Sequence, residues 1–172
     1  MMPRLFIFDA DDTLRTTTVA HQPCPHGPDE WALLPGVRER LVQIPWGPRG
    51  PFLALASNQD HVGYGLLPAA VAHRLLLDLA LAAAGPTRPA PYIGFCPHPA
   101  EDRCACRKPA PGLLLRALAH FQVNAAAALF IGNAPSDAAA AHRAGITYCH
   151  AGDFFTAHPR RGTGQPKRRS RQ

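Results

Sequence analysis

The sequence predicts an α/β protein built on a doubly wound, Rossmann-like parallel sheet. Short apolar runs alternate with longer helical stretches along most of the 172 residues, the pattern of repeated βαβ units. Turn-forming residues bound each run, and polar side chains with reactive chemistry follow several runs, where an open parallel sheet binds its ligands. The length allows one domain with a single sizeable core.

Five short apolar runs are predicted as strands, because strands buried on both faces read as continuous hydrophobic segments. They cover residues 5–8, 52–56, 92–95, 127–131 and 146–149.

Helices are predicted between these runs, and the last three are rich in alanine and leucine, which favour helix. They cover residues 36–44, 67–84, 111–121 and 135–144. Proline-rich segments at 21–28 and 45–51 are predicted as loops. Alternating strands and helices of this length predict parallel pairing with right-handed crossovers.

The formal charge of +6 is concentrated at one end of the chain. Residues 1–158 carry twelve basic and twelve acidic side chains, so the predicted folded domain is neutral. Residues 159–172 hold the other six basic residues, no acidic residue and no apolar periodicity, which predicts a disordered basic tail. We interpret the tail as solubilising, and a weak electrostatic arm for nucleic acid is the alternative.

The chain has no run of 18 apolar residues and no signal-peptide-like apolar region at its start. A cytoplasmic protein without a membrane partner is therefore expected.

Two carboxylates, Asp9 and Asp11, directly follow the first predicted strand. One carboxylate can attack an electrophile while its neighbour transfers a proton, and Mg²⁺ can offset their negative charge. A solvated turn after a strand is the alternative, since Asp is a common turn residue. The pair predicts a metal-dependent reaction at this edge of the sheet.

Other polar side chains stand at the ends of later strands. Ser57 and Asn58 follow residues 52–56, and Asp137 stands in the segment after residues 127–131. Lys108 precedes a predicted helix and can act as a point charge for phosphate. Each has a structural alternative, such as a helix cap or a solvated charge. Their order at successive strand ends favours a shared site.

Three cysteines and one histidine lie within eleven residues, namely Cys96, His98, Cys104 and Cys106. A Cys₃His set completes a tetrahedral structural zinc site. Disulfides or unconnected thiols are the alternatives, and a cytoplasmic chain disfavours disulfides. The triplet from Cys24 to His26 lacks a second thiol pair and predicts a proline-rich loop rather than a metal site. His61 has no ligand spacing either.

Between Phe6 and about Gly145 the chain resembles the haloacid dehalogenase (HAD) superfamily of phosphohydrolases. The resemblance implies that Asp9 is the nucleophile and Asp11 the general acid and base. It also implies that Ser57 and Lys108 hold the phosphate. Asn58 and Thr13, which matches the family's threonine in the first loop, are expected to bind the phosphate or substrate as well.

The stretch from Cys96 to Gly112 is similar to the capless, zinc-loop branch of subfamily IIIA. That branch includes phosphatases of heptose bisphosphate and of histidinol phosphate. The resemblance implies a substrate-phosphate contact by Arg107 in fork geometry, no cap domain, and a monomer.

Two positions depart from the family pattern. Asn133 stands where the last motif has its first Asp, and Asp12 stands where glycine is usual. The resemblance implies Mg²⁺ ligation by Asp9, the backbone carbonyl of Asp11 and Asn133, with Asp137 either binding the ion directly or lying just behind its ligands. An amide oxygen can still bind Mg²⁺, but it removes one negative charge and should weaken metal affinity.

The expected function is a Mg²⁺-dependent phosphatase of carbohydrate or related metabolism with a structural Zn²⁺. Its substrate is expected to be a small phosphorylated metabolite: a sugar phosphate, a heptose bisphosphate or histidinol phosphate. A polynucleotide 3'-phosphatase assisted by the basic tail is one alternative. A domain that binds phosphorylated ligands without turnover, because of Asn133, is the other.

Overall fold

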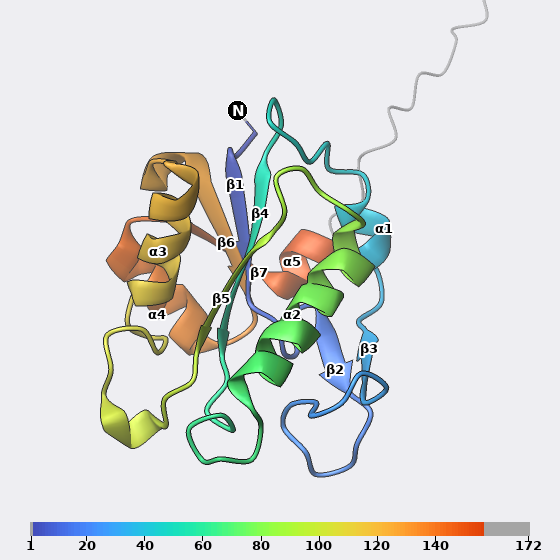
Figure 1. Cartoon of the computed structure of the whole chain (residues 1–172). Helices are drawn as coiled ribbons and strands as arrows, with labels where there is room; N and C mark the ends of the chain where they lie inside the picture. The colour runs from blue at the N-terminus through green and yellow to red at the C-terminus, as the bar shows by residue number, and fades with distance from the viewer. Residues whose placement is uncertain (1, 157–172) are drawn as a thin grey trace, which may run out of the picture.

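The computed structural model describes residues 2–156 and has a five-stranded parallel sheet at its centre (Figure 1). The strands lie in the order β5-β4-β1-β6-β7, and every neighbouring pair is parallel. Their bounds are β1 Leu5–Phe8, β4 Phe52–Asn58, β5 Tyr92–Cys96, β6 Ala128–Gly132 and β7 Thr147–His150. The predicted α/β class and doubly wound sheet are confirmed.

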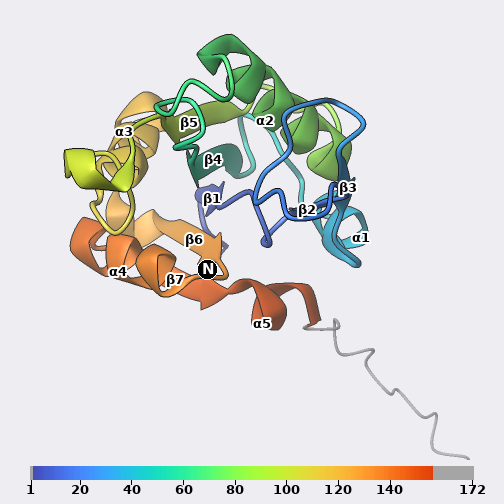
Figure 2. The ribbon, with the colours of Figure 1, turned by 90° about the horizontal axis from the view of Figure 1, so that it is seen from below.

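Helices cover both faces of the sheet (Figure 2). One layer contains α1 (Val37–Leu41), α2 (Ala69–Ala84) and α5 (Ala151–Thr156), and the other contains α3 (Gly112–Phe121) and α4 (Pro135–Ala144). The side chains of β1 alternate between two cores, with Phe6 and Phe8 in the first layer's core and Leu5 and Ile7 in the second's. This alternation explains why the strand reads as an uninterrupted apolar run.

The predicted strands shift by at most two residues, and the 36–44 helix is shorter than predicted, ending at Leu41. Two features were not predicted. β2 (Arg15–Thr17) and β3 (Trp31–Leu33) form a small antiparallel pair, and α5 follows β7 directly. Strands of three residues and a six-residue helix are too short to show a readable period.

The order of the strands creates a switch point at β1. The chain runs from β1 outward through β4 to β5, and then crosses back to β6 and β7 on the other side. Neighbouring crossovers therefore diverge above the carboxyl end of β1, which opens a crevice at that edge. This edge lies at the bottom of Figure 1 and faces the viewer in Figure 2.

The segment from β1 to β4 holds only the β2–β3 pair, α1 and loops. No helical cap domain is present within residues 2–156. Over the same residues, no helix is long and apolar enough to cross a membrane. The predicted basic tail of residues 159–172 lies outside the described part of the chain.

Candidate active site

A buried row of three charges lies at the carboxyl end of β1. Lys108 Nζ is 2.5 Å from Asp9 Oδ1 and 2.7 Å from Asp137 Oδ1. All three side chains are buried. Asp9 continues β1, with its backbone N–H donating to Ile131 in β6, so the sheet itself fixes the position of its carboxylate.

The three charges together act on the proton affinity of Asp9 and Lys108. Burial raises the pKa of Asp9; the Lys108 ammonium opposes this rise and the Asp137 carboxylate adds to it. Burial acts to lower the pKa of Lys108, but the two carboxylates outweigh that effect and raise it above its ordinary value. Lys108 therefore favours its charged form between these two carboxyl groups. The row carries more negative than positive charge, a balance that suits a further cation.

Asp11 is held by two side chains. Arg15 Nε lies 2.8 Å from its Oδ1, and Gln59 Nε2 donates to its Oδ2 at 2.8 Å. Arg15 is fully buried at the start of β2, close to the ring of Trp31. We did not single out Arg15 or the contact of Gln59 with Asp11 from the sequence. The spacing of four residues between Asp11 and Arg15 was the only local signal for the first contact.

Ser57 and Asn58, at the end of β4, have different surroundings. Ser57 Oγ accepts a hydrogen bond from Gln59 Nε2 at 2.9 Å and lines the cleft. Asn58 donates to the backbone carbonyl of Lys108 at 3.1 Å and accepts from its N–H at 3.0 Å. Its side chain thus clamps the lysine backbone, and the predicted phosphate contact by Asn58 stays a prediction.

Asp137 uses both carboxylate oxygens. Oδ2 accepts the backbone N–H groups of Asn133 and Ala134 at the start of α4, while Oδ1 faces Lys108. Gly132 permits this arrangement, because a Cβ there would lie 2.4 Å from Asp137 Oδ2. The capping role of Asp137 and its charge pairing with Lys108 therefore depend on the glycine before Asn133.

Thr13 lies between Asp9 and Asn133, the residue that differs from the family pattern. Its buried hydroxyl oxygen lies 3.3 Å from Asp9 Oδ2 and 3.1 Å from Asn133 Oδ1. A hydroxyl has one hydrogen and can donate to only one of these acceptors at a time. Two oxygen acceptors next to excess negative charge form a donor set of the type that Mg²⁺ prefers. The residues present therefore fit a hard divalent cation.

These side chains surround one open cleft of about 220 Å³. Nine residues line it: Asp9, Asp11, Ser57, Asn58, Lys108, Asn133, Ala134, Ser136 and Asp137. The structure thus brings to one place every residue proposed for phosphoryl chemistry except Thr13, which is buried beneath it, and Arg107.

Arg107 lies in a neighbouring groove that shares Lys108 with the cleft. Its guanidinium is paired with Asp60 at 3.0 Å and donates to the carbonyl of His98. Arg103 and Arg143 line the same groove. The groove is basic and adjoins the cleft, so an anionic group extending from the cleft would meet it.

Asp12, the other departure, adopts a φ of +59°. This left-handed conformation favours glycine, and Asp is one of the residues that tolerate it. Its backbone N–H donates to the backbone carbonyl of Arg15 at 2.7 Å, and its side chain is exposed. Asp12 thus satisfies the turn's backbone without entering the cleft lining.

The predicted zinc ligands converge. The three sulfurs of Cys96, Cys104 and Cys106 are 3.3 to 3.4 Å apart, and His98 Nδ1 is 3.5 Å from Cys96 and 3.3 Å from Cys106. All five cysteines of the chain are free thiols. Three sulfurs and one imidazole at these distances can enclose a tetrahedral ion. The η1 turn (Ala100–Asp102) between them buries no side chain, so the loop has little apolar packing of its own.

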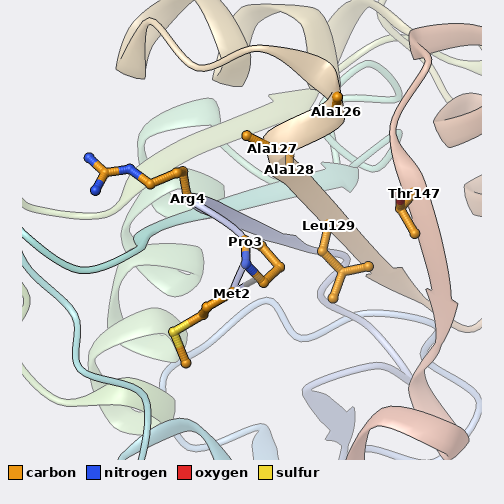
Figure 3. Close-up of a pocket in the computed structure, with 8 residues that line it drawn as sticks. All are labelled: Met2, Pro3, Arg4, Ala126, Ala127, Ala128, Leu129 and Thr147. Carbon is orange, nitrogen blue, oxygen red and sulfur yellow. The ribbon is translucent and has the colours of Figure 1, made fainter.

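A second hollow, of about 280 Å³, lies at the opposite end of the sheet (Figure 3). Residues at the amino ends of β1, β6 and β7 line it, including Pro3, Arg4, Leu129 and Thr147. Among the described residues that line it there is no carboxylate, thiol or imidazole, and Arg4 is the only charged side chain. This hollow thus offers no carboxylate, thiol or imidazole for chemistry of the kind that the cleft can perform.

The fold and site match the arrangement expected of a HAD-like hydrolase. Paired aspartates follow β1, a serine lies at the end of β4, and a buried lysine precedes α3. In agreement, the family model described as HAD-hydrolase-like matches residues 105–150.

Curated relatives extend this match. The D-glycero-beta-D-manno-heptose-1,7-bisphosphate 7-phosphatase of Bordetella bronchiseptica is 33% identical over 147 residues, covering 83% of this chain and 76% of the relative. The enzyme of that name from Pseudomonas putida is 30% identical, covering 66% of this chain and 63% of the relative. The D-glycero-alpha-D-manno-heptose-1,7-bisphosphate 7-phosphatase of Mycobacterium tuberculosis is 37% identical, covering 66% and 58%. The chain thus spans less than two thirds of two of these three relatives.

Solved structures agree. The D,D-heptose 1,7-bisphosphate phosphatase of B. bronchiseptica, complexed with magnesium and phosphate, matches with a TM-score of 0.69 and 30% identity, covering 84% of this chain and 78% of that one. A HAD-like phosphatase from Mesorhizobium loti, at 21% identity, shares the fold with a TM-score of 0.64. The chain belongs to the HAD superfamily, in the family of the heptose-1,7-bisphosphate 7-phosphatases.

Proposed function

We propose that this protein is a Mg²⁺-dependent phosphomonoester hydrolase that acts on a small phosphorylated sugar through an aspartyl-phosphate intermediate. The observation that carries the proposal is the Asp9 carboxylate, held 2.5 Å from a buried lysine in an open cleft beside a second, oriented carboxylate. The family relatives named as heptose-bisphosphate phosphatases support the substrate class.

Asp9 is proposed as the nucleophile. Lys108 holds Oδ1, and Oδ2, which lies 3.3 Å from the Thr13 hydroxyl, is the oxygen proposed to attack phosphorus. The Oδ2–phosphorus bond forms as the bond from phosphorus to the leaving oxygen breaks. Lys108 and Ser57 Oγ are placed to meet the charge of the transferring group, where preorganised donors contribute most to the rate.

Asp11 is proposed as the proton carrier. It protonates the leaving oxygen in the first step and takes a proton from the attacking water in the second, which returns Asp9 to a free carboxylate. Arg15 and Gln59 fix the orientation of this carboxylate from two sides. These two residues position the acid and base from outside the cleft lining.

Mg²⁺ would be held by Asp9, the backbone carbonyl of Asp11 and Asn133. The Asp137 carboxylate, paired with Lys108, would add negative charge beside the ion. When bound it supplies positive charge to the phosphoryl oxygens. Asn133 provides a neutral ligand where the family pattern has a charged one, so we expect weaker metal binding and a need for higher Mg²⁺ concentrations.

Zn²⁺ is proposed as the structural ion of the loop formed by Cys96, His98, Cys104 and Cys106 (the zinc loop). All four ligand positions are filled by protein, which leaves no room for a reacting group. Free thiols at this density suit a reducing compartment, so we propose a cytoplasmic protein. A monomer is proposed by likeness to the capless branch.

A phosphate-release assay with added Mg²⁺ tests the proposal. Heptose 1,7-bisphosphate, histidinol phosphate and a 3'-phosphorylated oligonucleotide would be compared, using the full chain and a chain lacking residues 159–172. Asp9→Asn, which keeps the shape of the side chain, is the matched control for contaminating phosphatases. We expect the sugar phosphate to be the best substrate, with no effect of the truncation.

Other outcomes would replace the proposal. Preference for the oligonucleotide, lost on truncation, would establish a polynucleotide phosphatase. Binding of phosphorylated ligands without release of phosphate, at any Mg²⁺ concentration, would establish a non-catalytic binding domain.

A further inference from the structure

A second thiol and imidazole cluster lies outside the cleft and the zinc loop. Cys24 Sγ is 3.3 Å from His61 Nδ1, and His26 Nε2 is 2.6 Å from the same nitrogen. The three ligand atoms all lie within 4.8 Å of one another. Cys24 is 7% exposed, and both histidines are half-buried. Neither the proposed phosphoryl chemistry nor the zinc loop uses any of the three.

The loop that carries Cys24 and His26 is organised by its own polar contacts. Glu30 Oε2 accepts the backbone N–H groups of His26 and Gly27, and also the side chain of Gln22. Gln22 in turn donates to the backbone carbonyl of Cys24 at 2.8 Å. The Cys-Pro-His turn is therefore held in shape independently of any contact with His61.

The loop that carries His61 is fixed from the other side. A Cβ at Gly63 would lie 2.4 Å from Pro99 Cδ and 2.6 Å from the carbonyl of Pro97, so this loop packs tightly against the zinc loop. The two loops meet at the lower edge of the molecule in Figure 1. Two separately anchored segments thus direct three metal-ligating side chains at one point.

The donor atoms are close enough together to share one transition-metal ion. Around a tetrahedral zinc, with bonds of about 2.0 Å to nitrogen and 2.3 Å to sulfur, the donors lie about 3.3 to 3.8 Å apart. The sulfur to His61 distance is within that range, and the two imidazoles would have to separate by about 0.7 Å. The sulfurs of the zinc loop, at 3.3 to 3.4 Å, would also have to move apart. Half-buried imidazoles at the ends of loops can make such a movement.

We propose that Cys24, His26 and His61 form a second metal site that binds Zn²⁺. One thiolate and two imidazoles select a borderline-soft divalent ion over Mg²⁺ or Ca²⁺. Three protein ligands leave the fourth position of a tetrahedron for water or another oxygen ligand, whereas the zinc loop supplies all four.

The site lies on the same edge of the sheet as the cleft. His61 is two residues beyond Gln59, which donates to Asp11, and Asp60 between them pairs with Arg107. An ion bound here would thus be linked to the cleft and to the basic groove through two consecutive side chains. It would also join the segment after β2 to the segment after β4.

Metal content tests the site without any assay of activity. The full chain would be produced with added zinc, dialysed against a weak chelator, and its zinc measured by elemental analysis. We expect about two zinc ions per chain in the wild type and one fewer in His26→Ala and in Cys24→Ser. His73→Ala, an exposed histidine of α2, and Cys149→Ser, a cysteine of β7, are matched controls that should keep the wild-type content.

Cys106→Ser separates this site from the zinc loop, because it should remove the other ion. If the zinc loop bound nothing, the wild type would hold one ion and His26→Ala none, which would still support the second site. His26→Ala with the same zinc content as the wild type would overturn it and leave a plain imidazole hydrogen bond. Since His26 is half-buried in a loop, this variant decides the question even if Cys24→Ser fails to fold.

Discussion

The cleft and the zinc loop occupy neighbouring parts of the same sheet edge but are built in opposite ways. The cleft is assembled from the ends of β1, β4 and β6 and from the segment before α3, so its charged residues are far apart in the chain. The zinc ligands come from eleven consecutive residues. The cleft holds two buried carboxylates against one buried ammonium. In the zinc loop, metal ligands take the place of the apolar packing that the loop lacks. Variants should therefore separate chemistry from stability.

Asp9→Asn should have the largest effect on chemistry. Losing the nucleophile should lower turnover by about 10⁴-fold or more. The amide keeps the shape of the side chain, and Lys108 keeps Asp137 as a partner, so thermal unfolding should change little. Phosphate release and a melting curve on the same sample measure both. Turnover near the wild-type level would place the nucleophile elsewhere.

Lys108→Met should lower both the turnover and the free energy of unfolding, because Lys108 serves the reaction and also neutralises buried carboxylates. Removing the cation leaves the carboxylates of Asp9 and Asp137 buried without their partner. We expect a loss of about 10²- to 10³-fold in turnover and of about 3 kcal/mol in the free energy of unfolding. Arg116→Met, at an exposed position of α3, is the control. Unchanged unfolding would show that the carboxylates do not need the lysine.

Asn133→Asp should strengthen metal binding in the cleft. Restoring a carboxylate next to Thr13 and Asp9 should lower the Mg²⁺ concentration for half-maximal turnover by about tenfold. Titrating Mg²⁺ against phosphate release measures this change. Asn124→Asp adds the same charge at an exposed, distant position and should leave the titration unchanged. An identical Mg²⁺ requirement in Asn133→Asp would mean that residue 133 is not a ligand.

Cys106→Ser, or removal of zinc by a chelator, should have the smallest effect on turnover and a clear one on stability. We expect a fall of about 10 °C in the melting temperature, while turnover at low temperature stays within about twofold, since the zinc ligands do not line the cleft. Cys149→Ser is the thiol control. Loss of turnover in a sample that remains folded would contradict the separation of the two regions.

Much of the fold was predictable because its signals are local. Apolar runs and Ala- and Leu-rich stretches identified every strand of the main sheet and four of its five helices. The β2–β3 pair and α5 were missed, because elements of three to six residues carry no period. Arg15 was missed as well: its burial against Asp11 depends on that short β2 strand.

The same division applies to the polar clusters. The four ligands of the zinc loop were predictable because a Cys₃His set within one loop is a local pattern. The cluster of Cys24, His26 and His61 was interpreted as a proline-rich loop and an unrelated histidine. His61 lies 37 residues from Cys24 and 35 residues from His26 in sequence, so no local pattern joins them. Only the packing of two loops brings them together.

The amino-acid sequence alone determined the α/β class, the reactive residue types at each strand end and the composition of the zinc loop, because each depends on residues that are neighbours in the chain. The tertiary structure decided which of those residues touch. Lys108 reaches Asp9 across 99 residues and Asn58 clamps the lysine backbone across 50. Such contacts follow from the order of strands in the sheet, and side-chain packing sets their final distances.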